Sequence, residues 1–149
     1  WRVIPMPKME VTIPTDLIRK LEKMGSEGDE IGKKMLTSGA KILRDEVDQN
    51  LKKNLYTNRK PSRNYPTGAL ERSLTTDKVK KDKNGNQYIS LYFKGKDSKD
   101  VSNNLKATVM EHGSSKQQKK PFIRPAVDKT EGLVNQEMQN IFDRENNKL

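Results

Sequence analysis

The sequence predicts an α+β fold in which an antiparallel β-sheet packs with a long amphipathic helix, short helices and a C-terminal helix. Apolar residues recur with a 3.6-residue period over residues 31–55 and again over residues 126–142, as in amphipathic helices. Apolar and polar residues alternate over residues 8–13 and 87–94, as in half-buried strands. The resulting order of strand, two helices, hairpin and two helices is typical of α+β proteins with an antiparallel sheet.

The first strand is expected over residues 8–13, and Pro14 ends it. Thr15 is expected to cap a short helix, and Gly25 suits the left-handed position that commonly follows a helix end. The apolar positions of this strand and helix are Met9, Val11, Ile13, Leu17, Ile18, Leu21 and Met24.

The longest helix is expected to begin at Asp29, a residue type favoured at N-caps, and to continue to residue 55. Its apolar stripe consists of Ile31, Met35, Ile42, Leu43, Val47, Leu51 and Leu55. Gly39 and Ala40 fill the gap in this stripe. A glycine there lowers helix stability but lets another backbone approach closely. We therefore expect close packing at Gly39, the alternative being a glycine that is merely tolerated.

A loop and a hairpin are expected in the middle of the chain. Residues 56–66 contain two prolines and no periodicity, which predicts an extended, exposed loop. A short helix should follow over residues 67–74, burying Ala69, Leu70 and Leu74. Asn84-Gly85 predicts a hairpin between residues 75–81 and 87–94, because both residues accept positive φ. In its second strand Ile89, Leu91 and Phe93 should face one side, and Tyr88, Ser90 and Tyr92 the other.

Two more helices are expected toward the C-terminus. The first covers residues 101–110, carries Val101, Leu105, Thr108 and Val109, and ends near His112-Gly113. Residues 114–120 read as a flexible basic loop. Pro125 stands where the first turn of a helix accepts proline. The apolar face of the last helix should be Val127, Thr130, Val134, Met138, Ile141 and Phe142.

Composition narrows the classes of protein to consider. A chain of 149 residues suggests one domain, and at 31% hydrophobic residues a monomer should bury only a thin core. Part of the chain is then mobile, or copies of the chain gain burial by assembling. The absence of cysteine excludes disulfides, thiolate zinc sites and thiol nucleophiles. No apolar run approaches the roughly 18 residues that would span a bilayer, so no membrane partner is expected, and the N-terminus lacks the apolar region of a signal peptide.

The net charge of +10 arises in the middle of the chain, where residues 51–120 carry 17 basic and six acidic residues. Such a block attracts phosphate or an acidic protein surface, although it can also be an ordinary solvated surface. Four tyrosines lie within this block, and stacking surfaces for nucleic acid combine aromatic and basic residues. No recognition motif accompanies them, so the pattern predicts contact with phosphate without base specificity.

No catalytic constellation is present. The single histidine, His112, has no second histidine or cysteine to complete a common zinc site. Ser114 and Ser115 follow it in a polar loop, but adjacency in sequence does not make a nucleophile, base and orienting acid. The glycines form neither a Walker loop nor a dinucleotide fingerprint. We therefore expect no enzymatic activity, no cofactor and no metal.

Two motifs resemble those of a known family. Residues 111–126 read E-H-G-S-S-K-Q-Q-K-K-P-F-I-R-P-A, and residues 66–74 read P-T-G-A-L-E-R-S-L. Together they resemble the phage head–tail joining family, also called tail-completion or tail-component proteins. There a Glu-x-Gly-Thr/Ser turn leads into Pro-Phe-x-Arg-Pro-Ala and a final helix. The chain departs from this pattern in Ser114, where threonine is common, and in the lysine-rich loop that follows.

The resemblance covers roughly residues 15–142. It implies one head–tail joining domain over that range, preceded by an N-terminal segment and first strand (1–14) and followed by a polar tail (143–149). It also implies a closed ring, commonly of six copies, that completes the tail of a tailed phage or tail-like particle. A tail-tube or tail-terminator ring would lie on one side and a head-side connector or stopper on the other, with packaged DNA passing through. The protein would assemble in the bacterial host cytoplasm and reside in the neck or tail of the virion.

Two sets of site residues follow from the resemblance and the basic block. Contacts between subunits or rings are expected at Glu111, Gly113, Phe122, Arg124, Pro125, Arg59 and Arg63. Positive charge at the DNA channel is expected from Lys80, Lys81, Lys83, Lys119 and Lys120. Arg124 is expected to bond a carboxylate bidentately, either Glu111 or an acid of the next subunit. Alternatively, the motif only fastens the last helix to its own domain.

A different function remains open on the same residues. A small basic accessory protein that binds nucleic acid nonspecifically and acts alone would carry the same charge. Its assembly state distinguishes it from the ring-forming subunit.

Overall fold

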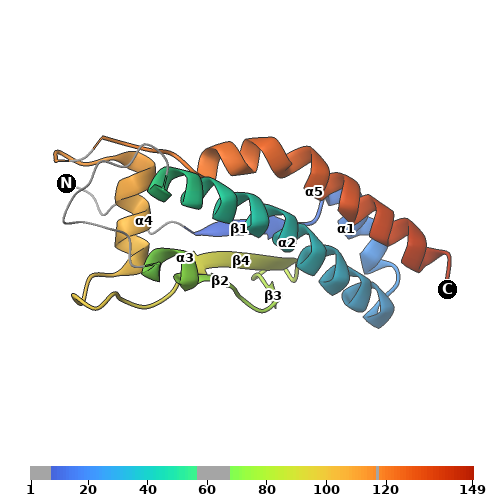
Figure 1. Ribbon diagram of the computed structural model, residues 1–149. Coiled ribbons are helices and arrows are strands. Elements are labelled where there is room, and N and C mark those ends of the chain that lie inside the picture. Colours follow the sequence, from blue (N-terminus) through green and yellow to red (C-terminus); the bar gives the residue numbers. More distant parts are fainter. Residues whose placement is uncertain (1–7, 57–67, 117) are drawn as a thin grey trace.

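The computed structural model describes residues 8–56, 68–116 and 118–149 (Figure 1). Its elements, in chain order, are β1 (Met9–Thr12), α1 (Thr15–Glu22), α2 (Ser26–Tyr56), α3 (Ala69–Ser73), β2 (Leu74–Thr76), β3 (Lys80–Lys81), β4 (Gln87–Phe93), α4 (Asn103–His112) and α5 (Ile123–Asn146). Within the described ranges, no helix combines the length and apolar character needed to cross a membrane.

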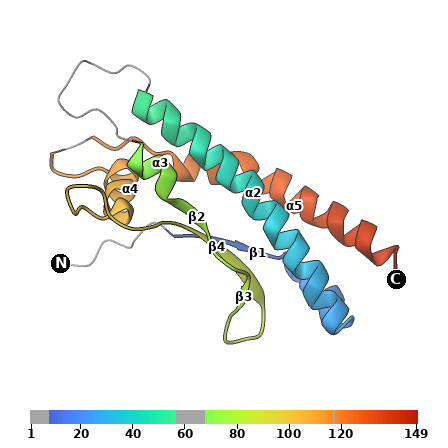
Figure 2. The same cartoon turned by 60° about the horizontal axis from the view of Figure 1, so that its bottom comes forward.

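The predicted α+β class is confirmed. Strand β4 lies at the centre of the sheet and pairs antiparallel with β1 on one side and with β2 and β3 on the other. The long helices α2 and α5 run side by side and cover one face of the sheet, while α4 stands across one end (Figures 1 and 2). The apolar side chains of β4 point toward these helices, so the sheet and the helix pair share one core.

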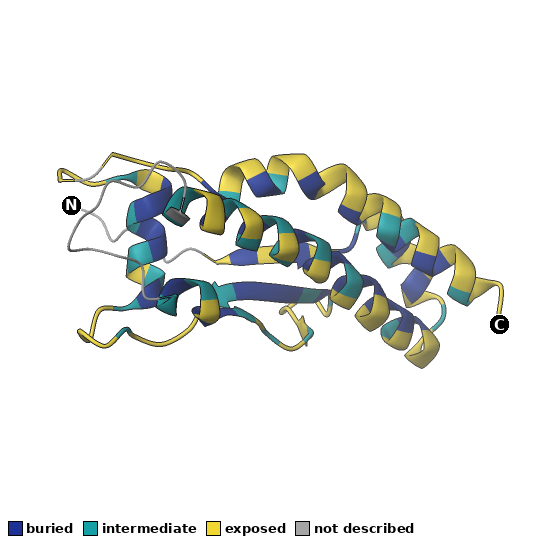
Figure 3. Cartoon of the chain, in the orientation of Figure 1, coloured by how far each residue is buried: buried dark blue, intermediate teal, exposed yellow. Residues whose placement is uncertain are grey.

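That core is more continuous than the composition suggested. One cluster of buried apolar side chains extends from Leu17 of α1, along α2 and α5, to Ala107 and Met110 of α4. The long helices make this possible because each collects its few large apolar residues on one stripe. The opposite faces of the same helices are exposed (Figure 3) and carry most of their charged residues. The described part of the chain therefore has its own core before any assembly.

The first elements largely follow the prediction. Met9, Val11 and Ile13 are buried, and Gly25 takes a φ of +63° between α1 and α2. The two predicted caps were wrong. Thr15 is the first residue of α1, and Pro14 stands before it without a capping side chain. Helix α2 begins at Ser26, and the N–H of Asp29 donates to Gly25 O at 3.1 Å, because the turn after α1 leads directly into α2.

The close approach expected at Gly39 is confirmed. A Cβ built on Gly39 would lie 3.0 Å from both Met138 Cε and Val134 Cγ1 of α5. Side-chain carbons in contact are usually about 3.5–4.0 Å apart. The missing side chain therefore lets α5 pack directly on the backbone of α2.

The predicted hairpin is present, with a turn that differs in detail. Asp82 Oδ1 accepts hydrogen bonds from the N–H groups of Asn84 at 2.8 Å and Asn86 at 3.0 Å. Gly85 takes a positive φ of 82°, but Asn84 does not. The turn is therefore a longer loop centred on the Asp82 carboxylate. As predicted, β4 buries Ile89, Leu91 and Phe93, whereas Tyr88 and Tyr92 on its other face are half-buried.

The short helices differ from expectation in their limits and faces. Helix α3 ends at Ser73, because Leu74 starts β2, and Ala69 is only half-buried. Helix α4 begins after Ser102, whose side chain accepts from the N–H of Leu105 at 3.3 Å. Its buried residues are Asn103, Ala107, Thr108, Met110 and Glu111. Val101 and Leu105, expected on the apolar side, are 38% and 47% exposed. Val101 precedes α4, and Leu105 lies on the side of α4 opposite the buried residues that pack against α3 and β4. Of the loop predicted at 56–66, Tyr56 is the last residue of α2, and the rest lies outside the described residues.

Candidate functional site

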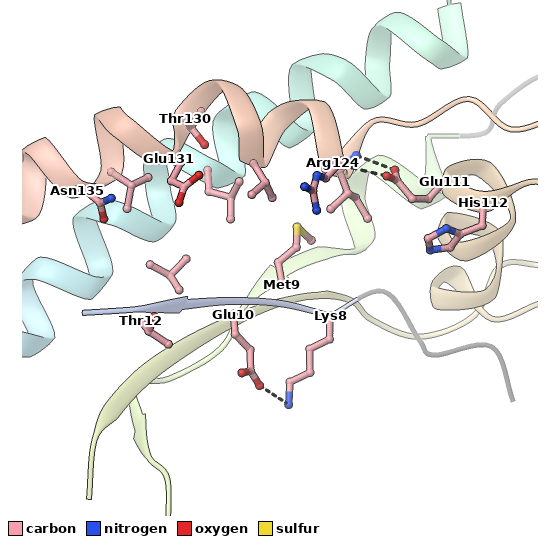
Figure 4. A pocket seen from close by; sticks show the side chains of 15 residues that line it. Lys8, Met9, Glu10, Thr12, Glu111, His112, Arg124, Thr130, Glu131 and Asn135 are labelled. Carbon is pink, nitrogen blue, oxygen red and sulfur yellow. Dashed lines mark hydrogen bonds and ion pairs between the residues drawn. The ribbon is translucent and has the colours of Figure 1, made fainter. Parts of the chain in front are cut away.

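The site is built around the carboxylate of Glu111, which lies at the end of α4 and is 8% exposed. Its Oε1 accepts hydrogen bonds from the N–H groups of Phe122 and Ile123, both at 2.8 Å. Its Oε2 accepts one from Arg124 N–H at 3.0 Å, and Figure 4 shows Glu111 reaching toward the backbone at Arg124. The first N–H groups of a helix lack partners within the helix, and that end attracts negative charge. Glu111 therefore caps α5 from another helix, in place of a capping side chain at the start of α5 itself.

The loop between α4 and α5 is closed at its base. Gly113 takes a φ of 79°, and its N–H donates to Val109 O at 2.7 Å, which turns the chain out of α4. The N–H of Lys120 donates to Met110 O at 2.7 Å when the chain returns. The Glu-x-Gly and Pro-Phe motifs are therefore separated by a loop whose two ends are both hydrogen-bonded to the last turn of α4.

Phe122 fastens this junction to the core. Its ring is fully buried and packs edge-on against Phe93 of β4, with 5.9 Å between ring centroids. Its carbonyl accepts from Asn50 Nδ2 at 3.2 Å, and Asn54 Nδ2 donates to Lys120 O at 2.9 Å. The motif therefore ties α4, α5, α2 and β4 together within one subunit.

The prediction that the Arg124 guanidinium bonds Glu111 was wrong. Only the backbone N–H of Arg124 reaches Glu111. The side chain is 79% exposed and pairs with Asp128 one turn later, with Nε 3.2 Å from Oδ1. Backbone N–H groups at the start of α5 occupy both carboxylate oxygens of Glu111. The Arg124 guanidinium lies instead at the surface, beside the exposed Pro125. A bond from Arg124 to an acid of a neighbouring subunit stays a prediction.

Arg124→Lys is expected to change the free energy of unfolding of the isolated subunit by less than about 0.5 kcal/mol, since exposed pairs one helical turn apart contribute about 0.3–0.5 kcal/mol. Urea unfolding measures this, with Arg144→Lys at the exposed far end of α5 as the matched control. If Arg124→Lys weakens assembly but leaves the stability of the subunit unchanged, the planar guanidinium of Arg124 bonds a neighbouring subunit. A loss of more than about 1 kcal/mol in the isolated subunit would contradict the surface role described above.

A groove of about 560 Å³ lies between β1 and the first half of α5 (Figure 4). Its apolar walls include Val11, Ile123, Val127 and Val134, and charged side chains stand around them. Exposed His112 lies at one end of the groove. Among the described residues, no three His, Cys, Asp or Glu side chains gather closely enough to hold a metal ion.

The five lysines expected at a DNA channel do not lie together. Lys80, Lys81 and Lys83 belong to the hairpin, whereas Lys119 and Lys120 lie in the loop beside α4 (Figure 2). Two of the hairpin lysines have acidic neighbours in the subunit: Lys80 pairs with Asp77 and Lys81 with Asp29, each at 3.0 Å. Arg59 and Arg63, expected at a subunit contact, lie outside the described residues.

A second basic loop accompanies residues 114–120 at the α4 end of the molecule (Figure 1). It follows β4 and carries the exposed residues Lys94, Lys96 and Lys99. Asp97 organises it: a hydrogen bond from the Lys106 ammonium at 2.8 Å, with backbone N–H groups of the loop, lowers the pKa of the Asp97 carboxyl to about 2. The sequence placed these lysines in the basic block, and the fold puts them at the same end of the molecule as the loop 114–120, with α4 between the two loops (Figure 1).

Comparison with known proteins gives one match. The family model described as "Bacteriophage HK97-gp10, putative tail-component" matches residues 15–113, which include Glu111 and Gly113 but end before the Pro-Phe-x-Arg-Pro-Ala run. No curated protein and no solved structure matches the chain. The matched residues make up well over half of the chain and contain the long helix, the Thr-Gly element, the hairpin and α4. The chain therefore belongs to the HK97-gp10-like family of phage tail components.

Proposed function

We propose that this chain forms a closed ring, of six copies, at the top of a phage tail, where it completes the tail and joins it to the head-side connector. A tail-tube or tail-terminator ring would contact one face and a connector or stopper the other. Packaged DNA would pass through the hole. The proposal is supported by the family to which the chain belongs, since that family consists of phage tail components and a tail component is a structural part of the virion.

The feature that best supports a place beside DNA is the concentration of positive charge at the α4 end. The loops flanking α4 carry six exposed lysines: Lys94, Lys96, Lys99, Lys116, Lys119 and Lys120. Two aspartates lie in the same loops, but Asp97 is engaged by Lys106 and Asp100 by Lys96. Most of this charge therefore remains available to phosphate, which needs no base-specific contacts. The hairpin lysines are partly neutralised by their own subunit.

Imaging the parent particle with this subunit located is the direct test of the ring. A closed ring of this chain between tail tube and head connector is the expected result. A chain found only outside the particle, monomeric in solution and still bound to nucleic acid would favour the small basic accessory protein instead.

Substitutions test which lysines face DNA. The triple change Lys116, Lys119 and Lys120 to Gln should reduce the slope of log affinity against log salt for duplex DNA by about 2–3, since each phosphate contact contributes about 0.9. The matched control changes Lys23, Lys33 and Lys41, three exposed lysines of the α1–α2 region, to Gln and should alter the slope by less than about 1. The measurement is DNA binding by the assembled protein at several salt concentrations. Equal slopes for the two triple variants would contradict the assignment of DNA to the α4 end.

We also propose that the protein is not an enzyme, because His112 is exposed and the described residues around it supply no nucleophile and base. A metal-dependent hydrolysis that disappears in His112→Ala would overturn this.

A further inference from the structure

The sheet has two open edges. Within the described residues, β1 pairs only with β4, and β2 and β3 also pair only with β4. An edge strand presents backbone N–H and C=O groups that no neighbouring strand satisfies. The two edges differ in sequence and lie on opposite sides of β4, so they are two different surfaces of one subunit.

The groove described above follows the open edge of β1. Five consecutive residues, from Lys8 to Thr12, line it. Successive side chains of a strand point to opposite faces, so a groove that touches all five must run along the backbone edge. Its opposite wall is the side of α5 that carries Ile123 and Val127, both half-buried. An extended segment of about five residues, roughly 16 Å long, can lie there with its backbone toward β1.

The other edge carries a net positive charge. Residues 76–81 form its outer part and contain three lysines and one aspartate, Asp77, and both residues of β3 are exposed. The groove beside β1 is lined by the carboxylates of Glu10, Glu111 and Glu131 and by the cations of Lys8 and Arg124, so its formal charge is negative by one. Lysines on an edge oppose pairing with an identical edge. They favour pairing with an edge that carries carboxylates.

We infer that the β1 groove of one copy binds the edge segment 76–81 of a second copy, so that the sheet continues from subunit to subunit. Two different edges in contact make a head-to-tail interface, and such an interface closes into a ring when the rotation between copies allows. This inference rests on the proposed ring and names the surfaces that build it. It also assigns the hairpin lysines to protein contact and leaves the α4 end for phosphate.

The register of the sheet makes a sharp test possible. Thr12 and Lys80 both pair with Tyr88, from opposite sides of β4, so within one subunit they are about two strand spacings, roughly 9–10 Å, apart. A disulfide needs Cα atoms less than about 7 Å apart. The chain has no cysteine of its own. A disulfide between cysteines placed at these two positions must therefore join two copies.

The experiment oxidises the assembled protein carrying Thr12→Cys with Lys80→Cys, and a second variant carrying Glu10→Cys with Lys80→Cys to allow for the other register. We expect a ladder of covalent dimers, trimers and larger species on a non-reducing gel, ending at the ring size. Each single-cysteine variant should stay monomeric on the gel, and a mixture of the two singles should stop at dimers. Thermal unfolding of the reduced variants verifies that each is folded.

The possible failures are distinguishable. Wild-type rings seen by light scattering, with no ladder from either double variant, would overturn the edge-to-edge contact while leaving the ring proposal intact. The groove would then be occupied by another segment, such as the residues that precede Lys8 or a different virion protein. Dimers from a single-cysteine variant would show like edges in contact and would also overturn it. The absence of any wild-type oligomer, in solution and in the particle, would overturn both proposals.

Discussion

Replacing Glu111 with alanine is expected to lower the free energy of unfolding by about 3 kcal/mol. The change leaves three N–H groups at the start of α5 without their acceptor. Losing a helix cap costs about 0.5–2 kcal/mol, and hydrogen bonds to a charged group contribute about 1.5–3 kcal/mol. Burial adds to the effect because water cannot readily replace the carboxylate. Urea unfolding followed by circular dichroism measures it.

Two variants serve as controls for Glu111→Ala. Glu131→Ala removes an exposed glutamate of α5 and should change stability by less than about 0.5 kcal/mol. Glu111→Gln keeps one oxygen acceptor but places an amide NH₂ opposite a backbone N–H, so its loss should fall between wild type and alanine. If Glu111→Ala unfolds within about 0.5 kcal/mol of wild type, the cap is not what holds α5 to α4.

Phe122→Ala is expected to be the most destabilising single truncation at this junction, by about 3–5 kcal/mol. The ring is fully buried, and its loss opens a cavity beside Phe93 where four elements meet. Phe122→Leu fills much of that volume and should cost only about 1–1.5 kcal/mol. Thermal and urea unfolding of the two variants give the comparison. Similar stabilities for alanine and leucine would mean that the site collapses around the smaller side chain and that the aromatic contact contributes little.

These two residues change how the signature segment is understood. Glu111 and Phe122 were expected at a contact between subunits, but each has partners inside its own subunit that account for its residue type. Their role between subunits stays a prediction. Arg124 and Pro125 are the exposed members of the segment. A defect in assembly caused by Glu111→Ala or Phe122→Ala would therefore have to be separated from a defect in folding, whereas one caused by Arg124→Lys would not.

The fold class, most of the helices and strands, and the family could be predicted from the sequence alone. These follow from local patterns: the stripe along α2, the alternation in β1 and β4, the hairpin at Asn84-Gly85 and the position of Pro125. Each depends on residues only a few positions apart, and the periods of helices and strands are fixed by backbone geometry. The close approach at Gly39 could be predicted for the same reason, because a gap in an apolar stripe indicates a neighbour.

Which side chains and backbone groups contact one another depends on how distant elements pack in three dimensions. Arg124 appeared to be a partner for Glu111 by charge, but three backbone N–H groups of α5 take that carboxylate because the end of α4 meets the start of α5. The exposed face of α4, the separation of the hairpin lysines from Lys119 and Lys120, and the groove along β1 also depend on how distant elements pack. Residues far apart in the chain leave no periodic signal of their contacts, so charge and hydrophobicity alone do not select among possible partners.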